Sequence, residues 1–170
     1  MTVVGDGAVG LMAVLAAKQM GAARIIAMSP HKSRQAFALE YGATDIVAER
    51  DDAGLARVKE LTQDVGGDAV LECVGSQESM AEAIRCARPR AMIGYVGVPH
   101  GVQLDGQVLF FWQTGMLTPV RRFLPDLIDM VLRREINPGK VFDLELPIAD
   151  VAEGYRAMDE RRAIKTLLRV

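Results

Sequence analysis

Three glycines near the start of the chain have the spacing of a phosphate-binding turn. Residues 5–10 read Gly-Asp-Gly-Ala-Val-Gly and lie between an apolar, β-prone run at 2–4 and an alanine-rich stretch with helical periodicity. In such a turn the first glycine permits a tight bend, the second lets a pyrophosphate approach the backbone, and the third lets the helix pack close to the strand. Free N–H groups at the helix start then hold the phosphates. The motif predicts a dinucleotide site, with a glycine-rich turn that binds nothing as the alternative. Its residues are Gly5, Gly7, Ala8, Val9 and Gly10.

The end of the second predicted strand carries no acidic residue. Folds that bind NAD commonly place a carboxylate there, where it accepts hydrogen bonds from the 2′-hydroxyl of the adenosine ribose. Ser29 occupies this position, and no carboxylate occurs between Arg24 and Glu40. Cationic side chains near this point would attract a 2′-phosphate. We therefore expect NADP rather than NAD, with ordinary solvated charges at a helix start as the alternative. The expected contacts come from Ser29, His31, Lys32 and Arg34.

The histidines and cysteines have no metal-binding pattern. The chain has two of each, on separate predicted elements: Cys73, Cys86, His31 and His100. A catalytic zinc requires three protein ligands and an open position, so we expect no zinc within this chain. We expect the cysteines to be small buried hydrophobic residues in a reducing compartment, and His100 to be an exposed loop residue. No tyrosine is followed four residues later by lysine, which excludes the catalytic pair of short-chain dehydrogenases.

Strands and helices alternate along most of the chain. Short apolar runs bounded by glycine predict strands, and stretches with a 3.6-residue period predict the helices between them. Such a pattern gives a parallel sheet covered on both faces. We expect one α/β domain over residues 1–170, with the doubly wound parallel sheet of the Rossmann fold. The expected strands are 2–4, 24–28, 45–48, 69–74, 91–96, 142–146 and 166–170, with a short one near Met116. The expected helices are 8–20, 32–41, 51–65, one capped by Ser76, 121–134 and 149–159.

Composition and charge exclude several classes of protein. Half of the 170 residues are hydrophobic and a quarter are charged, which is typical of a globular domain. A net charge of −2, with both signs interspersed, provides no attractive field for nucleic acid or for an anionic membrane. No apolar run has the length of a membrane span, and the first residues do not read as a signal sequence. We expect a cytoplasmic protein.

Four motifs occur together in an order and at a spacing that resemble those of a known family. They are the glycine turn at 5–10, Tyr-Gly-Ala-Thr-Asp at 41–45, Leu-Glu-Cys-Val-Gly at 71–75 and Gly-Tyr-Val-Gly-Val-Pro at 94–99. As a set they resemble the cofactor-binding, C-terminal domain of the medium-chain, zinc-dependent alcohol dehydrogenase superfamily. The resemblance extends over essentially the whole chain, to the segment at 161–168.

The resemblance implies a role for each matching position. The glycines hold the pyrophosphate, and Ser29, His31 and Arg34 fall where the family discriminates at the adenosine ribose. Lys165 falls where many members place an arginine that reaches the pyrophosphate. One strand end borders the adenine side of the cleft, and one loop presents its backbone to the nicotinamide carboxamide. These two segments are Cys73, Val74 and Gly75, and Val96, Gly97 and Val98.

Two features depart from the pattern of the family. Arg90 and Ala91 stand where a Gly-Gly turn is expected before the fifth strand, so we expect a changed turn there. The catalytic zinc ligands and proton relay of the family belong to an N-terminal domain that we expect to be missing from this chain. In the complete enzyme, hydride passes between an alcohol and the nicotinamide, with zinc as Lewis acid. We therefore expect the isolated chain to bind cofactor without turnover.

Two expectations concern protein partners. The segment 113–118, which begins with Gln113 and ends with Thr118, resembles the edge strand through which such domains pair into a homodimer. The apolar residues 108–112 are expected to be exposed in the isolated chain and to promote self-association, with positions in the core as the alternative. A non-catalytic dinucleotide-binding sensor or interaction module is the alternative function. A methyltransferase that uses S-adenosylmethionine is disfavoured by the glycine spacing and by Ser29.

Overall fold

The computed structural model describes residues 1–117 and 123–170. The chain divides into two compact units, residues 1–119 and residues 120–170, and each unit is considered by itself. The expectation that residues 1–170 form one domain stays a prediction.

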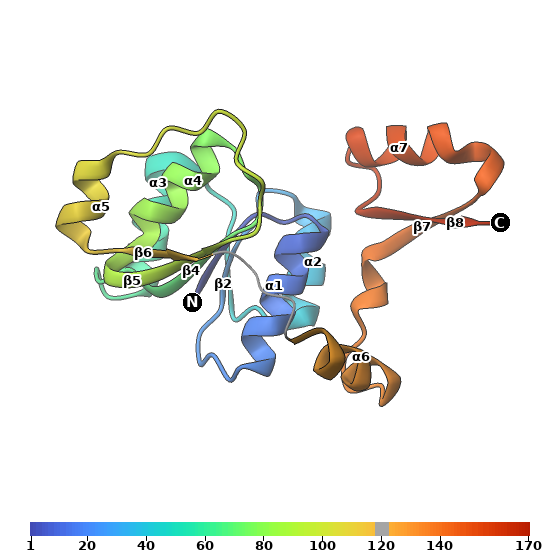
Figure 1. Cartoon of the computed structure of the whole chain (residues 1–170), viewed down its shortest axis with the longest axis horizontal. Coiled ribbons are helices and arrows are strands. Elements are labelled where there is room, and N and C mark those ends of the chain that lie inside the picture. Colours follow the sequence, from blue (N-terminus) through green and yellow to red (C-terminus); the bar gives the residue numbers. More distant parts are fainter. Residues whose placement is uncertain (118–122) are drawn as a thin grey trace. The chain divides into compact units, whose positions relative to one another are not determined.

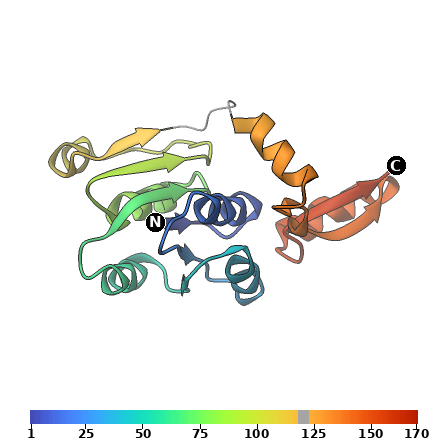
Figure 2. The same cartoon turned by 90° about the horizontal axis from the view of Figure 1, so that it is seen from below.

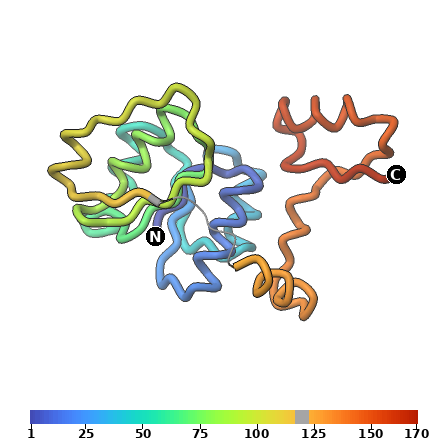
Figure 3. Tube along the Cα trace, in the orientation of Figure 1, coloured from blue at the N-terminus to red at the C-terminus, as the bar shows by residue number. Residues whose placement is uncertain are grey.

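The first unit is built on a six-stranded parallel sheet with the strand order β3-β2-β1-β4-β5-β6. The order reverses direction at β1, so that the chain first builds outward to β3 and then returns to place β4 on the other side of β1. Figure 3 traces the chain from its N-terminus, in blue, to its C-terminus, in red. This arrangement confirms the predicted doubly wound fold. The strands are β1 (Thr2–Val4), β2 (Ile26–Met28), β3 (Asp45–Val47), β4 (Gly67–Glu72), β5 (Ala87–Tyr95) and β6 (Gly115–Leu117).

Helices cover both faces of this sheet. The helix α1 packs beside α2, and α3 packs beside α4. Figures 1 and 2 show these two pairs on opposite faces. Because both faces are covered, every residue of β1 and β2 is buried, which explains the continuous apolar runs in the sequence. The helices are α1 (Ala8–Gln19), α2 (Lys32–Tyr41), α3 (Asp51–Leu61), α4 (Gln77–Cys86) and α5 (Gly106–Trp112).

Local signals in the sequence determine where several helices begin and end. The helix α2 ends at Gly42, whose φ of 116° lies in the left-handed region that glycine adopts without strain. Ser76 caps α4: its side chain accepts a hydrogen bond from the Ser79 backbone, and the Ser79 side chain accepts one from the Ser76 backbone. This is a reciprocal capping box in which serine takes the place of glutamate or glutamine.

Arg90 and Ala91, where a turn was expected before the fifth strand, lie within that strand in the structure. The strand β5 begins directly after α4, four residues earlier than predicted, and its pairing with β4 shifts register between Gly67 and Ala69. Arg90 has a φ of 63°, in the left-handed region. An arginine therefore occupies a backbone conformation that favours glycine.

The second unit has a small sheet of its own. Its two strands, β7 (Phe142–Pro147) and β8 (Lys165–Arg169), pair in parallel and are joined through the helix α7 (Val151–Asp159). The described part of the unit also contains α6 (Leu124–Leu132) and the 3-10 turns η2 (Pro138–Val141) and η3 (Ile148–Asp150). The predicted start of α6, at residue 121, lies outside the described residues. Within the described ranges, no helix has the length and apolar character needed to cross a membrane.

Candidate functional site

The glycine turn has the geometry that its spacing predicts. Gly5 follows β1 with a φ of 115°, a conformation that L side chains rarely adopt. A Cβ on Gly10 would lie 2.0 Å from the carbonyl oxygen of Gly5, so the close packing of α1 on the turn requires glycine there. A Cβ on Gly7 would meet no atom within 4 Å. Gly7 is also the N-cap of α1, and no side chain caps this helix end. Space and unpaired backbone donors thus coincide where a phosphate group would be held.

The turn lies at the carboxyl ends of β1 and β4, where the strand order reverses and ligands of doubly wound folds bind. Val74 follows β4, and its Cγ2 atom would be 2.8 Å from a Cβ on Gly5. A Cβ on Gly97 would lie 2.3 Å from the backbone nitrogen of Gly75. The structure therefore brings together three of the predicted segments: the glycine turn, the end of β4 with Val74 and Gly75, and the loop after β5 with Gly97.

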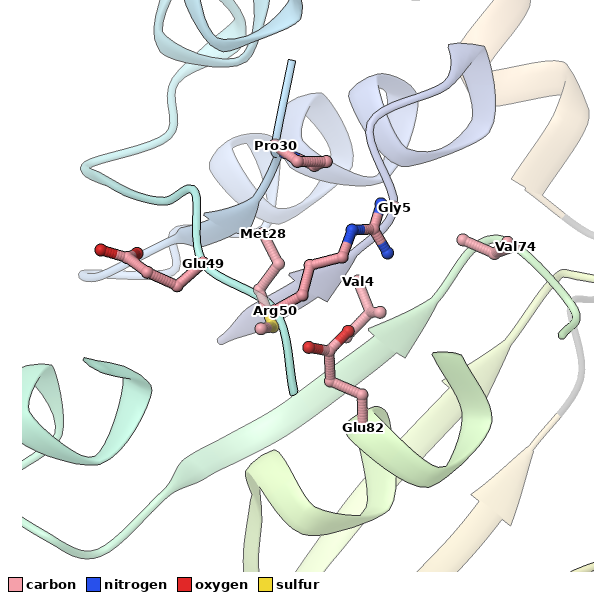
Figure 4. Close-up of a pocket in the computed structure, with 8 residues that line it drawn as sticks. All are labelled: Val4, Gly5, Met28, Pro30, Glu49, Arg50, Val74 and Glu82. Carbon is pink, nitrogen blue, oxygen red and sulfur yellow. The ribbon is translucent and has the colours of Figure 1, made fainter. Parts of the chain in front are cut away.

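A shallow hollow lies beside the turn (Figure 4). Its volume is about 240 Å³, part of which is open to solvent. In Figure 4, Arg50 extends across the hollow toward the Gly5 turn, and Glu82 approaches from α4. Burial raises the pKa of Glu82, and the nearby Arg50 lowers it by less. The lining residues are Val4, Gly5, Met28, Pro30, Glu49, Arg50, Val74 and Glu82.

Sequence reasoning missed three charged members of this lining. Glu49 and Arg50 follow β3, and Glu82 lies in α4, so none of them belongs to the glycine motif or to the strand-end motifs. Their approach to the glycine turn depends on the crossover that places β4 beside β1. The spacing of residues in the sequence does not show that these three side chains approach the glycine turn.

Asp6 connects the glycine turn to the end of β2. Its Oδ2 atom accepts a hydrogen bond from the Ser29 hydroxyl at 3.0 Å and lies 2.6 Å from Nδ1 of His31. Its Oδ1 atom accepts a hydrogen bond from Nη1 of Arg34 at 3.1 Å. Three of the four residues expected at the adenosine ribose thus converge on one carboxylate, while Lys32 is exposed at the start of α2. The sequence analysis did not assign Asp6 to the site, although an acid inside the phosphate-binding motif was a signal.

These contacts lower the pKa of Asp6. Only 7% of the residue is exposed, and its burial by itself would raise the pKa. The hydrogen bonds from His31 and Arg34, with a smaller contribution from Ser29, outweigh the cost of burial. Asp6 is therefore a charged carboxylate at neutral pH, beside two of the side chains, His31 and Arg34, that were expected to bind a 2′-phosphate.

Glu72 shapes the loop on the other side of the turn. This residue is fully buried at the end of β4. Its Oε1 atom accepts hydrogen bonds from the backbone N–H groups of Val74 and Gly75, both at 2.8 Å, and from the Ser79 hydroxyl at 2.7 Å. Glu72 thereby fixes Gly75 beside the loop after β5. A lone acidic residue in an apolar strand was the available signal, which the sequence analysis did not use.

The two cysteines and His100 differ in their burial. Burial raises the pKa of both Cys73 and Cys86 to about 12. Cys86 is buried as expected, whereas Cys73 is partly exposed, and His100 is exposed. Among the described residues, no group of three or more histidines, cysteines or acids is arranged to hold a metal ion. The residues present therefore do not fit a catalytic zinc site.

Two further predictions concern Lys165 and the edge strand at 113–118. Lys165 is at the start of β8 in the second unit, so its contact with the pyrophosphate stays a prediction. The edge position of β6 agrees with the expected edge strand at 113–118, although Thr118 lies outside the described residues.

Comparison with known proteins identifies relatives of the chain. The zinc-binding dehydrogenase family matches residues 8–126. A probable zinc-binding alcohol dehydrogenase of Mycobacterium tuberculosis is 32% identical over 161 residues, which cover 91% of this chain and 41% of that protein. The NADP-dependent isopropanol dehydrogenase of Thermoanaerobacter brockii is 34% identical over 157 residues, which cover 83% of this chain and 43% of that protein. The chain thus spans less than half the length of these relatives.

Solved structures agree with this relationship. The alcohol dehydrogenase of Thermus sp. ATN1 matches 99% of this chain and 50% of its own chain, with a TM-score of 0.90 and 28% identity. The benzyl alcohol dehydrogenase of Acinetobacter calcoaceticus matches 99% of this chain and 49% of its own, with a TM-score of 0.86 and 26% identity.

Proposed function

The chain belongs to the zinc-binding dehydrogenase family, and from that premise we propose that it serves a zinc-type alcohol dehydrogenase as the NADP-binding part. The observation that carries the proposal is the glycine turn: Gly10 packs against Gly5 where no larger residue fits, and the space in front of Gly7 is open. A bound nicotinamide dinucleotide would supply the centre that accepts or donates hydride.

Particular residues of this chain would hold the cofactor. The backbone N–H groups at the start of α1 would bind the pyrophosphate, assisted by Lys165. The end of β4, at Cys73, Val74 and Gly75, would border the adenosine part. The backbone after β5, at Val96, Gly97 and Val98, would bind the carboxamide and thereby orient the ring.

The preference for NADP rests on the charges at the end of β2. His31, Lys32 and Arg34 lie at the start of α2, and Ser29 stands where a carboxylate would repel a 2′-phosphate. The relative from T. brockii is named as NADP-dependent and is 34% identical. Asp6 opposes this preference, because its carboxylate faces His31 and Arg34.

Calorimetric titration of the chain with NADPH and with NADH tests the proposal. We expect both to bind, and NADPH to bind more tightly. The variant Arg34→Gln should weaken NADPH binding and leave NADH binding nearly unchanged, because only NADPH carries the 2′-phosphate. Tighter binding of NADH would contradict the NADP preference, and the absence of binding by either cofactor would contradict the proposed function.

Catalysis by the whole enzyme is proposed to be oxidation of an alcohol, or reduction of an aldehyde or ketone, with zinc ligands supplied from outside this chain. We expect added zinc to produce no alcohol oxidation by the chain alone, because its described residues do not fit a metal site. Clear turnover of an alcohol by the chain alone would contradict this part of the proposal.

A homodimer that forms through the segment 113–118 is also part of the proposal. The strand β6 stands at the end of the strand order, so one of its edges has backbone groups available to pair with a second copy. We further propose a cytoplasmic location, since both cysteines are free thiols, as expected in a reducing compartment.

A further inference from the structure

Asp6 is an acidic residue inside a motif that is expected to bind phosphate. It directly precedes Gly7, the N-cap of α1, and the first turn of α1 itself contains no acidic residue. A negative charge this close to the pyrophosphate would oppose cofactor binding. The structure shows how this charge is balanced, because the carboxylate contacts residues of the β2–α2 connection and of α2.

From this arrangement we infer that Asp6 determines specificity at the adenosine ribose: its carboxylate occupies His31 and Arg34 and thereby limits the affinity for a 2′-phosphate. The inference rests on the proposed function, because it concerns the same cofactor site. Asp6 acts through the side chains of His31 and Arg34 and is a positioning residue.

The contacts of the carboxylate support this role. Ser29 is 1% exposed and Asp6 7% exposed, so water screens their surroundings only weakly. The side chain of Arg34 is 13% exposed and that of His31 is 28% exposed, so both can reach a ligand at the surface. A 2′-phosphate bound by these two side chains would come close to the Asp6 carboxylate. Repulsion between the two anions would then offset part of the attraction to the cations.

A ligand without a 2′-phosphate would experience much less of this repulsion. Consider two ligands that differ only in the 2′-phosphate. Neutralising Asp6 should change their two affinities by different factors. A purely structural role of Asp6 would change both affinities by the same factor. This difference separates a role in specificity from a role in folding.

The test compares adenosine 2′,5′-bisphosphate with adenosine 5′-monophosphate, titrated calorimetrically into the chain. In Asp6→Asn the amide oxygen can still accept a hydrogen bond from Arg34, but the negative charge is gone. We expect the ratio of the two affinities to shift toward the bisphosphate by about tenfold. Asp6→Ser, a second neutral variant that retains an acceptor, should shift the ratio in the same direction.

Asp68→Asn provides the matched control. Asp68 lies at the amino end of β4, away from the glycine turn, and its loss removes the same charge from the same unit. It should leave the ratio unchanged. In the double variant Asp6→Asn/Arg34→Gln the shift should largely disappear, because Arg34 is the fixed cation that Asp6 occupies.

The outcomes are distinguishable. An unchanged ratio in Asp6→Asn and Asp6→Ser, or a shift toward the monophosphate, would overturn the role of Asp6 and leave the proposed function intact. If the unmodified chain bound neither nucleotide and neither NADPH nor NADH, the proposed function would fail and the inference would fail with it.

Discussion

At the scale of single residues, the second and third glycines of the turn, Gly7 and Gly10, have separable roles. Gly10→Ala would place a Cβ 2.0 Å from the Gly5 carbonyl oxygen, so we expect the free energy of unfolding to fall by about 1–3 kcal/mol. Gly7→Ala introduces a Cβ into open space, at a φ of −76° that alanine adopts readily. It should therefore lower stability by less than Gly10→Ala does, as measured by urea denaturation.

For cofactor affinity we expect the opposite order: Gly7→Ala should lower the affinity for NADPH more than Gly10→Ala does. The Cβ of Gly7→Ala lies where the pyrophosphate approaches the backbone, so we expect NADPH affinity to fall by about tenfold or more while the fold persists. Calorimetry on the two variants and the unmodified chain provides the measurement. Unchanged affinity in Gly7→Ala would show that the pyrophosphate does not pass over this residue.

Asp6 also makes stability depend on pH. Its pKa is lower in the folded chain than the ordinary value of 3.8, so its contacts stabilise the fold above pH 3.8. That contribution is lost as the pH falls through the lowered folded-state pKa. We compare the free energy of unfolding of the unmodified chain with that of Asp6→Asn. The contribution of Asp6 to the difference between them should be constant from pH 5 to 7 and should shrink below about pH 4. Thermal unfolding across this range measures it, and a difference that grew on acidification would contradict the contacts of Asp6.

Residue types and spacing could predict the positions of the site but not all of its contacts. The roles of Gly5 and Gly10 in the turn follow from motif spacing, because spacing along one strand and one helix determines local geometry. The contact of Asp6 with Ser29, His31 and Arg34 depends on how β1 and β2 pair, which brings together residues 23 to 28 positions apart. From the sequence these three residues were expected at a ligand; the acid within the glycine motif was visible, but its contact with them was not.

At the scale of elements, β5 contains a residue with a strained backbone, and a substitution can relieve that strain. Arg90 has a φ of 63°, which costs an L side chain about 1 kcal/mol relative to glycine. We expect Arg90→Gly to raise the free energy of unfolding by up to about 1 kcal/mol, as measured by urea denaturation. Arg90→Ala is the matched control: it removes the same side chain but retains the Cβ, so it should bring no such gain. Equal stability of the two variants would mean that the backbone at this position carries no strain.

Two elements that end at a glycine were predicted accurately, whereas β4, predicted at 69–74, spans Gly67–Glu72, and α3, predicted at 51–65, ends at Leu61. The bounds of β1 and α2 agree with the sequence analysis residue by residue, because Gly5 and Gly42 end these elements in conformations that few other residues adopt. The start of β5 was placed four residues late, because the segment from Arg88 to Arg90 is polar and contains a proline. Ala87, just before this segment, pairs with Gly67 of β4, and the pairing resumes at Met92, so the segment is an irregularity within the strand that has no local signal in the sequence.

At the scale of the whole molecule, the exposed aromatic residues of α5 are expected to promote association. Phe110 is 75% exposed and Phe111 is 76% exposed, and the two rings pack edge to face. The neighbouring Val108 and Leu109 pack on the core instead, so only part of the apolar segment 108–112 is available to a partner. Apolar surface of this kind favours association in water.

We expect the chain to self-associate at concentrations at which Phe110→Ser/Phe111→Ser is less associated, as measured by light scattering. Met20→Ser serves as a control, since Met20 is 81% exposed and belongs to a different element. A chain that stayed strictly monomeric at all concentrations would contradict the role of this surface and the proposed homodimer together.

The central claim is that the glycine turn holds a nicotinamide dinucleotide, and backbone NMR tests it most directly. In a ¹⁵N-labelled chain titrated with NADPH, we expect the largest amide shifts at Gly7, Ala8, Val9 and Gly10, with further shifts at Gly75 and Gly97. The first-turn amides of α1 are free to bind the phosphates, and the other two lie in the loops beside them. Saturating NADPH that left these amides unchanged, or shifted only residues 123–170, would contradict the account.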